Sequence, residues 1–152
     1  MAMLLYNIRK AQYANALVAS GAANRWNRTD EFVIYTGSSA SLATLELVVH
    51  RSGIRVDQTY KLLIIEAKAG PKDITTIDLD QLPANWKSIQ SYPELQSLGS
   101  EWYQAQKTLL LKVPSAVLPR ESNYIINTRH PDFASKVKIK ETELFVWDSR
   151  LL

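Results

Sequence analysis

The sequence contains no cysteine, which excludes disulfide bonds, thiolate zinc sites and cysteine nucleophiles together. Histidine is almost as scarce, because His50 and His130 are the only two in the chain. Two histidines so far apart in the sequence do not make a persuasive metal site. We therefore expect that no metal ion takes part in the function of this protein.

Long apolar runs are also missing, since none approaches the roughly 20 residues that a membrane-spanning helix needs. The N-terminal stretch MAMLLYNIRKAQYANALVASGAAN has basic residues ahead of apolar ones, as a signal peptide does. Asn15 and Ser20 interrupt its apolar part, and we expect a short amphipathic helix over residues 8–19 instead. The default expectation is then a cytoplasmic protein.

Glycine and proline are few, at five and six residues, and the sequence has no low-complexity tract or internal repeat. Of the 152 residues, 46% are hydrophobic and 22% are charged, which is typical of an ordinary globular protein. This length predicts a single domain, residues 1–152, with a substantial core. The net charge of +3 is modest, so we do not expect direct binding to nucleic acid.

What the sequence does contain is a series of short strand patterns with helices between them. Apolar runs predict strands in FVIYTG (32–37), TYKLLIIEA (59–67), TLLLKVPSAVL (108–118) and SNYIINT (122–128). VKIKETELFVWD (137–148) is interpreted as a hairpin that turns near ETE. The three lysines of KVKIK (136–140) alternate with Val137 and Ile139, which indicates the wet face of a strand at a sheet edge. Because regular βαβ alternation is absent, the predicted class is α+β, with a mixed or antiparallel sheet and flanking helices.

One predicted helix has a carboxylate beside its apolar stripe. SSASLATLELVVHRSG (38–53) begins with serines that suit an N-cap, and its stripe consists of Leu42, Leu45 and Val49. Glu46 lies within or just beside this stripe. A carboxylate turned toward a core is costly unless something compensates it, and such groups gather at functional sites. Glu46 is therefore a candidate catalytic residue, the alternative being a border residue paired with an arginine.

This helix belongs to a series of short motifs in a fixed order. They are RWN (25–27), YTGSS (35–39), Glu46, VPS (113–115), NYIIN (123–127), HPDF (130–133) and WDSRL (147–151). In order and spacing these motifs resemble the RES-domain family, the toxins of bacterial RES–Xre type II toxin–antitoxin pairs. The resemblance extends from about Tyr6 to Leu151.

The resemblance implies an ADP-ribosyltransferase-like fold that binds NAD+ as a substrate and cleaves its nicotinamide–ribose bond, depleting the cell of NAD+. The acceptor would be water or inorganic phosphate, the latter as a co-substrate, and no resident cofactor is implied. Transfer of ADP-ribose to a host protein is the alternative that the family also offers. The implied partner is an Xre-like antitoxin, which would make any DNA contact, and the toxin would form a homodimer within that complex.

The resemblance also assigns roles to five residues. Glu46 would stabilise the oxocarbenium-like ribose as nicotinamide leaves, and the ring of Tyr35 would stack on the nicotinamide. Arg25 would hold a pyrophosphate or ribose phosphate, while Ser115 and Asn123 would bind substrate oxygens. Each has a structural alternative. Tyr35 would be a core aromatic residue and Arg25 a cation stacked on tryptophan. Ser115 would cap a turn, and Asn123 would belong to a strand edge.

Two further hypotheses stay open, and one departure from the family pattern bears on the site. A small ribonuclease toxin would show steeply salt-dependent RNA binding, and a non-catalytic module would only bind a partner protein. The modest charge argues against the ribonuclease. Ala22-Ala23-Asn24 stands where the family usually has paired glycines, and alanine tolerates a left-handed backbone poorly.

Overall fold

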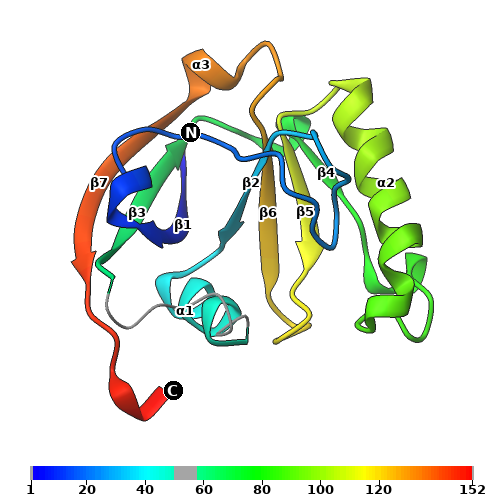
Figure 1. Ribbon diagram of the computed structural model, residues 1–152. Coiled ribbons are helices and arrows are strands. Elements are labelled where there is room, and N and C mark those ends of the chain that lie inside the picture. The colour runs from blue at the N-terminus through cyan, green and yellow to red at the C-terminus, as the bar shows by residue number, and fades with distance from the viewer. Residues whose placement is uncertain (1, 50–57, 152) are drawn as a thin grey trace.

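A computed structural model describes residues 2–49 and 58–151 of the chain (Figure 1). Its centre is a seven-stranded sheet of order β4-β5-β6-β2-β1-β3-β7. Neighbouring strands are antiparallel except for β4 and β5, which run parallel. The predicted α+β class with a mixed sheet is therefore confirmed. The strands are β1 (Met3–Lys10), β2 (Val33–Gly37), β3 (Tyr60–Ala67), β4 (Ile74–Thr76), β5 (Leu110–Pro114), β6 (Ser122–Asn127) and β7 (Val137–Phe145).

The helices lie around this sheet (Figure 1). Helix α1 (Ala40–Val49) directly follows β2, α2 (Tyr92–Ala105) lies beside β4 and β5, and α3 (Phe133–Lys136) precedes β7. Within the described ranges, no helix is long and apolar enough to cross a membrane. Single 3-10 turns are η1 (Ala11–Tyr13), η3 (Pro71–Asp73), η4 (Leu79–Gln81), η5 (Ile89–Ser91) and η6 (Ser149–Leu151).

Two hydrophobic clusters are buried on the sheet, and β5 contributes to both. Leu110 belongs to a cluster with Leu5 and Leu63, whereas Leu111 belongs to one with Trp26 and with residues of α2. Successive strand residues point to opposite faces, so β5 is covered on both sides. This explains why its sequence is a continuous apolar run without polar alternation.

The predicted helix over residues 8–19 is wrong. Residues 3–10 form β1, which pairs with β3 along its whole length, and only Ala11–Tyr13 make a helical turn. In the structure Leu5 is fully buried while its neighbour Leu4 is 39% exposed, an alternation that two adjacent leucines do not reveal in the sequence. The short apolar run did not distinguish this alternation from a helical period.

The predicted hairpin near ETE is also wrong. Residues Val137–Phe145 form the single strand β7, and its register with β3 shifts between Ile64 and Ile65. The shift leaves Lys140 without a partner residue, so a β-bulge occurs where a turn was predicted. The interpretation of the KVKIK lysines as the wet face of an edge strand is confirmed for Lys138 and Lys140, which are exposed on β7 at the end of the sheet. It is wrong for Lys136, which is the last residue of α3 and pairs with Asp73.

The turn from β2 into α1 fixes the position of the helix that carries Glu46. The Leu42 N–H donates to Ser39 Oγ at 3.0 Å, so Ser39 is the capping serine. A Cβ at Gly37 would lie 2.9 Å from the backbone nitrogen of Ala43, which leaves no room for a side chain. His50 and the predicted helix end at Gly53 lie outside the described residues.

Asp73 joins η3 to the end of α3, and this contact predicts a pH dependence. Its carboxylate accepts from the Gly70 N–H at 3.0 Å and pairs with Lys136 at 3.2 Å. The Gly70 hydrogen bond first, and Lys136 second, hold the pKa of Asp73 below its usual range. A carboxyl whose pKa is lower in the folded than in the unfolded state stabilises the folded state. The stabilisation is complete at pH values above the pKa in the unfolded state, and it is lost as the pH falls through the pKa in the folded state.

We therefore expect Asp73→Asn to unfold at a lower denaturant concentration than the wild type at pH 7. The difference should shrink below about pH 4, where unfolded aspartate is protonated. Denaturant titrations between pH 7 and pH 2 measure this difference between the variant and the wild type. The control is Asp80→Asn, at an exposed position. A difference that stays constant over this range contradicts the assignment.

Candidate active site

A cavity of about 340 Å³ lies between α1 and the strands β1, β2 and β6. We call it the Glu46 cavity. Three of the five predicted site residues line it, although they come from three different elements. Its lining residues include Asn7, Asn24, Tyr35, Glu46 and Asn123.

Neutral donors hold the carboxylate of Glu46. Its Oε2 atom accepts from Ser115 Oγ at 2.8 Å and makes a short hydrogen bond with Asn123 Nδ2. In the described part of the chain, no lysine, arginine or histidine pairs with this carboxylate. The alternative of a structural ion pair with an arginine is therefore not what the structure shows. The negative charge is oriented but not cancelled, so it remains available to a cation in the cavity.

Ser115 lies behind Glu46 and does not line the cavity. It is fully buried, and its Oγ accepts from the N–H groups of Val117 and Leu118, each at 3.1 Å, while donating to Glu46. Ser115 is thus the turn-capping serine of the structural alternative, with its one proton directed at the carboxylate. In this geometry its hydroxyl orients Glu46 and does not reach a ligand in the cavity.

Asn123, unlike Ser115, lines the Glu46 cavity. Its Nδ2 donates to Glu46, and its Oδ1 is buried without a hydrogen-bond partner among the residues that the structure describes. Buried polar atoms without partners are rare and usually have a functional or structural reason. The register pairs Asn123 with Gly37 on β2, which explains how β6 brings the amide to α1.

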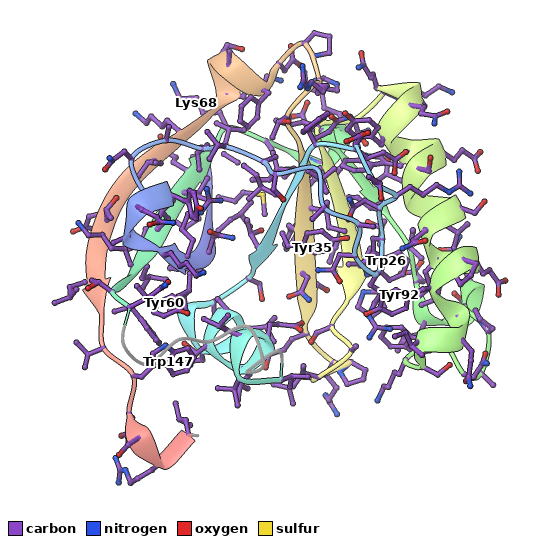
Figure 2. All side chains as sticks on the ribbon, in the orientation of Figure 1. Trp26, Tyr35, Tyr60, Lys68, Tyr92 and Trp147 are labelled. Atoms are coloured by element: carbon purple, nitrogen blue, oxygen red, sulfur yellow. The ribbon has the colours of Figure 1, made fainter. Side chains whose placement is uncertain are left out.

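Tyr35 connects the cavity to the RWN motif. Its hydroxyl donates to Asn27 Oδ1 at 2.6 Å and accepts from the Trp26 N–H at 3.0 Å. Burial is the largest influence on this hydroxyl and raises its pKa far above the ordinary value. Figure 2 shows Tyr35, Trp26 and Tyr92 in succession from the middle of the sheet towards α2. Tyr35 is both a lining residue and the anchor of the neighbouring loop.

Arg25 points away from the Glu46 cavity, towards the segment before α2. Its Nη1 donates to the carbonyl oxygens of Trp86 at 3.0 Å and Lys87 at 3.1 Å. Its guanidinium lies 4.9 Å from the ring centroid of Tyr92 and 5.9 Å from that of Trp86. These contacts match the structural alternative of a stacked cation. Arg25 does not line the cavity, so the structure does not bring it together with Glu46.

The loop at Ala22-Ala23-Asn24 does not need the glycines that the family pattern suggests. In the described ranges, positive φ angles occur at Gly21, Asp30 and Gln106 and at none of Ala22, Ala23 and Asn24, so these two alanines and the asparagine do not need a left-handed backbone. Asn24 Oδ1 accepts from the Arg25 N–H at 2.8 Å, and its carbonyl oxygen accepts from Gln96 Nε2 of α2 at 2.8 Å. Hydrogen bonds therefore fix this loop at the cavity.

Two important residues were not predicted from the sequence. Asn27 is 1% exposed, and its amide holds the RWN loop together through Ala22, Arg28 and Glu31. Asn7 lines the Glu46 cavity and donates to the Tyr35 carbonyl oxygen at 2.8 Å. Asn27 belongs to the RWN motif, which is otherwise surrounded by polar residues, and Asn7 interrupts the apolar stretch at the N-terminus. Neither feature distinguishes these asparagines from those of ordinary loops.

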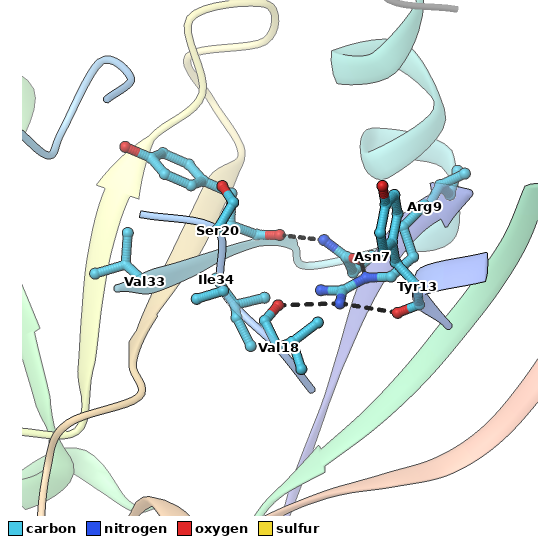
Figure 3. A pocket seen from close by; sticks show the side chains of 10 residues that line it. Asn7, Arg9, Tyr13, Val18, Ser20, Val33 and Ile34 are labelled. Carbon is cyan, nitrogen blue, oxygen red and sulfur yellow. Dashed lines mark hydrogen bonds between the residues drawn. The ribbon is translucent and has the colours of Figure 1, made fainter. Parts of the chain in front are cut away.

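A second cavity, of about 500 Å³, adjoins the first and shares Asn7, Ile8 and Tyr35 with it (Figure 3). Arg9 lies at this cavity, where its Nε donates to Asn7 Oδ1 at 2.7 Å and its Nη1 to the Val18 carbonyl oxygen at 3.1 Å. Burial lowers the pKa of Arg9. Its partners are neutral oxygens, so its positive charge is not neutralised by a carboxylate of the described chain.

The RWN loop packs on α2 at Gly99. A Cβ at this position would lie 1.7 Å from the carbonyl oxygen of Trp26, so no side chain fits without moving the loop or the helix. Overpacking of this kind costs about 1–3 kcal/mol. We expect Gly99→Ala to lower the melting temperature measured by circular dichroism.

The matched control is Gly70→Ala, because a Cβ at Gly70 meets nothing within 4 Å. It should leave the melting temperature nearly unchanged. Alanine is the better helix former, so helix propensity alone would raise the melting temperature of Gly99→Ala. A melting temperature that is unchanged or higher would contradict the cost assigned to the contact with Trp26.

Known proteins resemble this chain over nearly its whole length. The sequence signature described as "RES domain" matches residues 4–148. The chain is 32% identical to a Photorhabdus laumondii protein named "Toxin Res", over 99% of this chain and 97% of the relative. It is 35% identical to a Pseudomonas putida "Toxin Res", over 98% and 99% of the two chains. It is also 33% identical to a Sphingobium protein named "Prs ADP-ribosylating toxin", over 91% and 88%.

A solved structure has the same fold. The chain aligns with the M. tuberculosis MbcT-MbcA toxin-antitoxin complex at a TM-score of 0.75, covering 96% of this chain and 85% of that chain. The sequence identity is 16%, so this likeness establishes the architecture alone.

Proposed function

The chain belongs to the RES-domain family, and from this membership and the Glu46 cavity we propose that it is the toxin of a bacterial toxin–antitoxin pair, which cleaves the nicotinamide–ribose bond of NAD+. The carboxylate of Glu46 supports this proposal most strongly. It lies at a cavity, is oriented by Ser115 and Asn123, and is not neutralised by a cation of the described chain.

Cleavage of the nicotinamide–ribose bond needs little more from the protein than a negative charge near the ribose. As the bond between C1′ of the ribose and the nicotinamide nitrogen breaks, the electron pair leaves with nicotinamide and the ribose becomes positively charged. A carboxylate about 4 Å from that charge contributes on the order of 4 kcal/mol at an effective dielectric constant near 20. Because each 1.36 kcal/mol is tenfold in rate, Glu46 would accelerate cleavage roughly a thousandfold.

The two adjoining cavities suit the two halves of the substrate. Nicotinamide and its ribose would occupy the Glu46 cavity, with the ring of Tyr35 beside the pyridinium. The diphosphate would extend towards the second cavity, where Arg9 has no carboxylate partner in the described chain. Arg25 would act from the adjacent loop, as a positioning residue held by Trp86 and Tyr92.

Three acceptors complete the reaction in different ways. Water would give ADP-ribose and release a proton, inorganic phosphate would give a phosphorylated ADP-ribose, and a protein side chain would become ADP-ribosylated. The last is the second candidate function, favoured by the relative named as an ADP-ribosylating toxin. The implied setting is the bacterial cytoplasm, with an Xre-like antitoxin closing the cavity, a homodimeric toxin in the complex, and DNA contacted only through the antitoxin.

One assay tests the proposal. The chain, purified free of antitoxin, is incubated with NAD+ with and without phosphate, and the products are separated by chromatography. We expect free nicotinamide, with a second product that depends on the acceptor. Intact NAD+ with cleaved RNA in a parallel tube supports the ribonuclease hypothesis instead, and intact NAD+ and RNA support the non-catalytic module.

Tyr35→Phe separates the ring of Tyr35 from its hydroxyl. The variant keeps the ring at the cavity but leaves the Trp26 N–H and Asn27 Oδ1 without their partner, at a cost of about 1–3 kcal/mol. We expect a lower melting temperature with a KM for NAD+ close to that of the wild type, because stacking needs only the ring. Tyr35→Leu, which removes the ring as well, should raise the KM further. Equal KM values for both variants contradict the stacking role.

A further inference from the structure

The central sheet is split between β1 and β2. β1 pairs with β3 along its whole length and β2 pairs with β6 along its whole length, whereas in the described chain β1 and β2 share only the pair Tyr6–Gly37. Continued in the same antiparallel register, this ladder would place Ile8 opposite Tyr35. The ladder does not continue, and both cavities lie at the split, because Ile8 and Tyr35 line each of them.

A side-chain bridge spans the split (Figure 3). Asn7 Nδ2 donates to the carbonyl oxygen of Tyr35 at 2.8 Å, and Asn7 Oδ1 accepts from Arg9 Nε at 2.7 Å. The side-chain amide of Asn7 thus satisfies a carbonyl oxygen of β2 that faces the missing part of the ladder. β1 holds the backbone of Tyr35 through this amide, and Arg9 holds the amide in turn.

Arg9, at the far end of the bridge, has an unused donor. Its Nη1 donates to the carbonyl oxygens of Tyr13 and Ala16 at 3.4 Å and of Val18 at 3.1 Å, whereas Nη2 makes no hydrogen bond with the described residues. All partners of this half-buried guanidinium are neutral, and an uncompensated charge in such a place is costly. A phosphate group would compensate it, because phosphate oxygens accept charge-assisted hydrogen bonds from guanidinium N–H groups.

From the split, the bridge and the unused donor we propose that Asn7 is a positioning residue, which transmits the binding of a phosphate group at Arg9 to Tyr35. A phosphate bound to Arg9 at the second cavity favours the position of the guanidinium in which Nε holds Asn7, and Asn7 then holds the backbone of Tyr35 beside the nicotinamide. Without the phosphate, the charged guanidinium is better hydrated outside the cavity, and the bridge opens more often. The phosphate is the diphosphate of NAD+, so this role rests on the proposed function.

Binding energy from one half of the substrate then acts on the other half. Nicotinamide riboside contains the scissile bond but no phosphate, so it should be cleaved more slowly than NAD+. Saturating inorganic pyrophosphate, added separately, should raise its cleavage rate about fivefold, which is the effect of one hydrogen bond. Asn7→Ala should abolish this activation, and its kcat for NAD+ should fall about fivefold with the KM less affected.

Nuclear magnetic resonance tests the bridge without any turnover. The probe is inorganic pyrophosphate, titrated into the isotopically labelled chain while the side-chain amide of Asn7 and the carbonyl carbon of Tyr35 are observed. In the wild type we expect both signals to shift with the same dissociation constant. In Asn7→Ala, pyrophosphate should still shift the Nε signal of Arg9, but the Tyr35 signal should stay in place.

Two further variants separate the charge of Arg9 from its geometry. Arg9→Gln removes the charge and should abolish pyrophosphate binding, whereas Arg9→Lys keeps the charge but lacks Nε and should bind pyrophosphate without shifting the Tyr35 signal. The matched control is Lys10→Gln, which removes the same charge from the next residue of β1, and Lys10 lines neither cavity. This control should behave as the wild type does. Circular dichroism shows whether each variant is folded.

The wild-type titration alone can overturn the proposal. It does so if pyrophosphate leaves the Asn7 and Tyr35 signals unchanged, and a Tyr35 shift that persists in folded Asn7→Ala or Arg9→Gln has the same consequence. A chain that shows the shifts but leaves NAD+ intact would contradict the proposed function alone. A chain that cleaves NAD+ without showing the shifts would contradict only the role of Asn7.

Discussion

Replacing Glu46 with glutamine is expected to reduce the rate of NAD+ cleavage about a thousandfold without unfolding the protein. The substitution removes one negative charge and keeps the size and shape of the side chain. If the carboxylate acts by stabilising the positive ribose, the interaction exists only in the transition state. The loss should therefore appear in kcat, with the KM for NAD+ changed little.

The neighbours of Glu46 make the glutamine variant a clean test. The side-chain oxygen of glutamine can still accept from Ser115 and Asn123, as Oε2 of Glu46 does in the native protein. The melting temperature should therefore stay close to that of the wild type. Nicotinamide release followed by chromatography gives kcat, and Glu94→Gln, at an exposed position on α2, is the matched control.

Two outcomes would contradict this role. A variant that keeps wild-type turnover would show that the charge does not act on the transition state. A variant that loses turnover together with its fold would show that Glu46 is a structural residue. Ser115→Ala should fall between the wild type and Glu46→Gln, because it removes one hydrogen bond to the carboxylate and leaves the charge in place.

The strands with long apolar runs could be predicted from the sequence, whereas β1 and β7 could not, although β1 lies inside the sheet and β7 at its edge. β5 has a continuous apolar run because both of its faces are buried, one in each hydrophobic cluster. β3 has a similar run, although only its alternate residues Leu63, Ile65 and Ala67 are fully buried. The predicted helix over residues 8–19 overlaps the end of β1, where the residues are all half-buried and no alternation indicates a strand. β7 was mistaken for a hairpin because a bulge and a turn both interrupt alternation, and only the pairing with β3 distinguishes them.

The same division holds for the candidate site. The position of Glu46 on one side of a capped helix was readable from local spacing alone. The contacts of Arg25 and Ser115 were not, because Arg25 binds the carbonyl oxygen of Trp86, 61 positions away, and Ser115 binds Glu46, 69 positions away. Motif order placed these residues in one region. The tertiary packing decided which of them line the cavity.

Asn27→Asp is expected to be the most destabilising single substitution among those proposed. The native amide donates to the carbonyl oxygens of Ala22 at 3.0 Å, Arg28 at 3.0 Å and Glu31 at 3.2 Å, while its oxygen accepts from Tyr35. An ionised carboxylate of the same size has no donor, so three carbonyl oxygens would face a buried negative charge. An uncompensated buried charge costs roughly 3–5 kcal/mol.

Circular dichroism should therefore show a melting temperature lower by roughly 10 °C or more at pH 7. The deficit should shrink as the pH falls, because a protonated carboxyl is neutral and regains one donor. Asn15→Asp makes the same chemical change at an exposed position and should have little effect. A deficit that is small at pH 7, or that grows on acidification, would show that this amide is not what holds the RWN loop against Tyr35. The positions of Arg25 and Trp26 would then depend on the other contacts of the loop, those of Arg25 with Trp86 and of Asn24 with Gln96 among them.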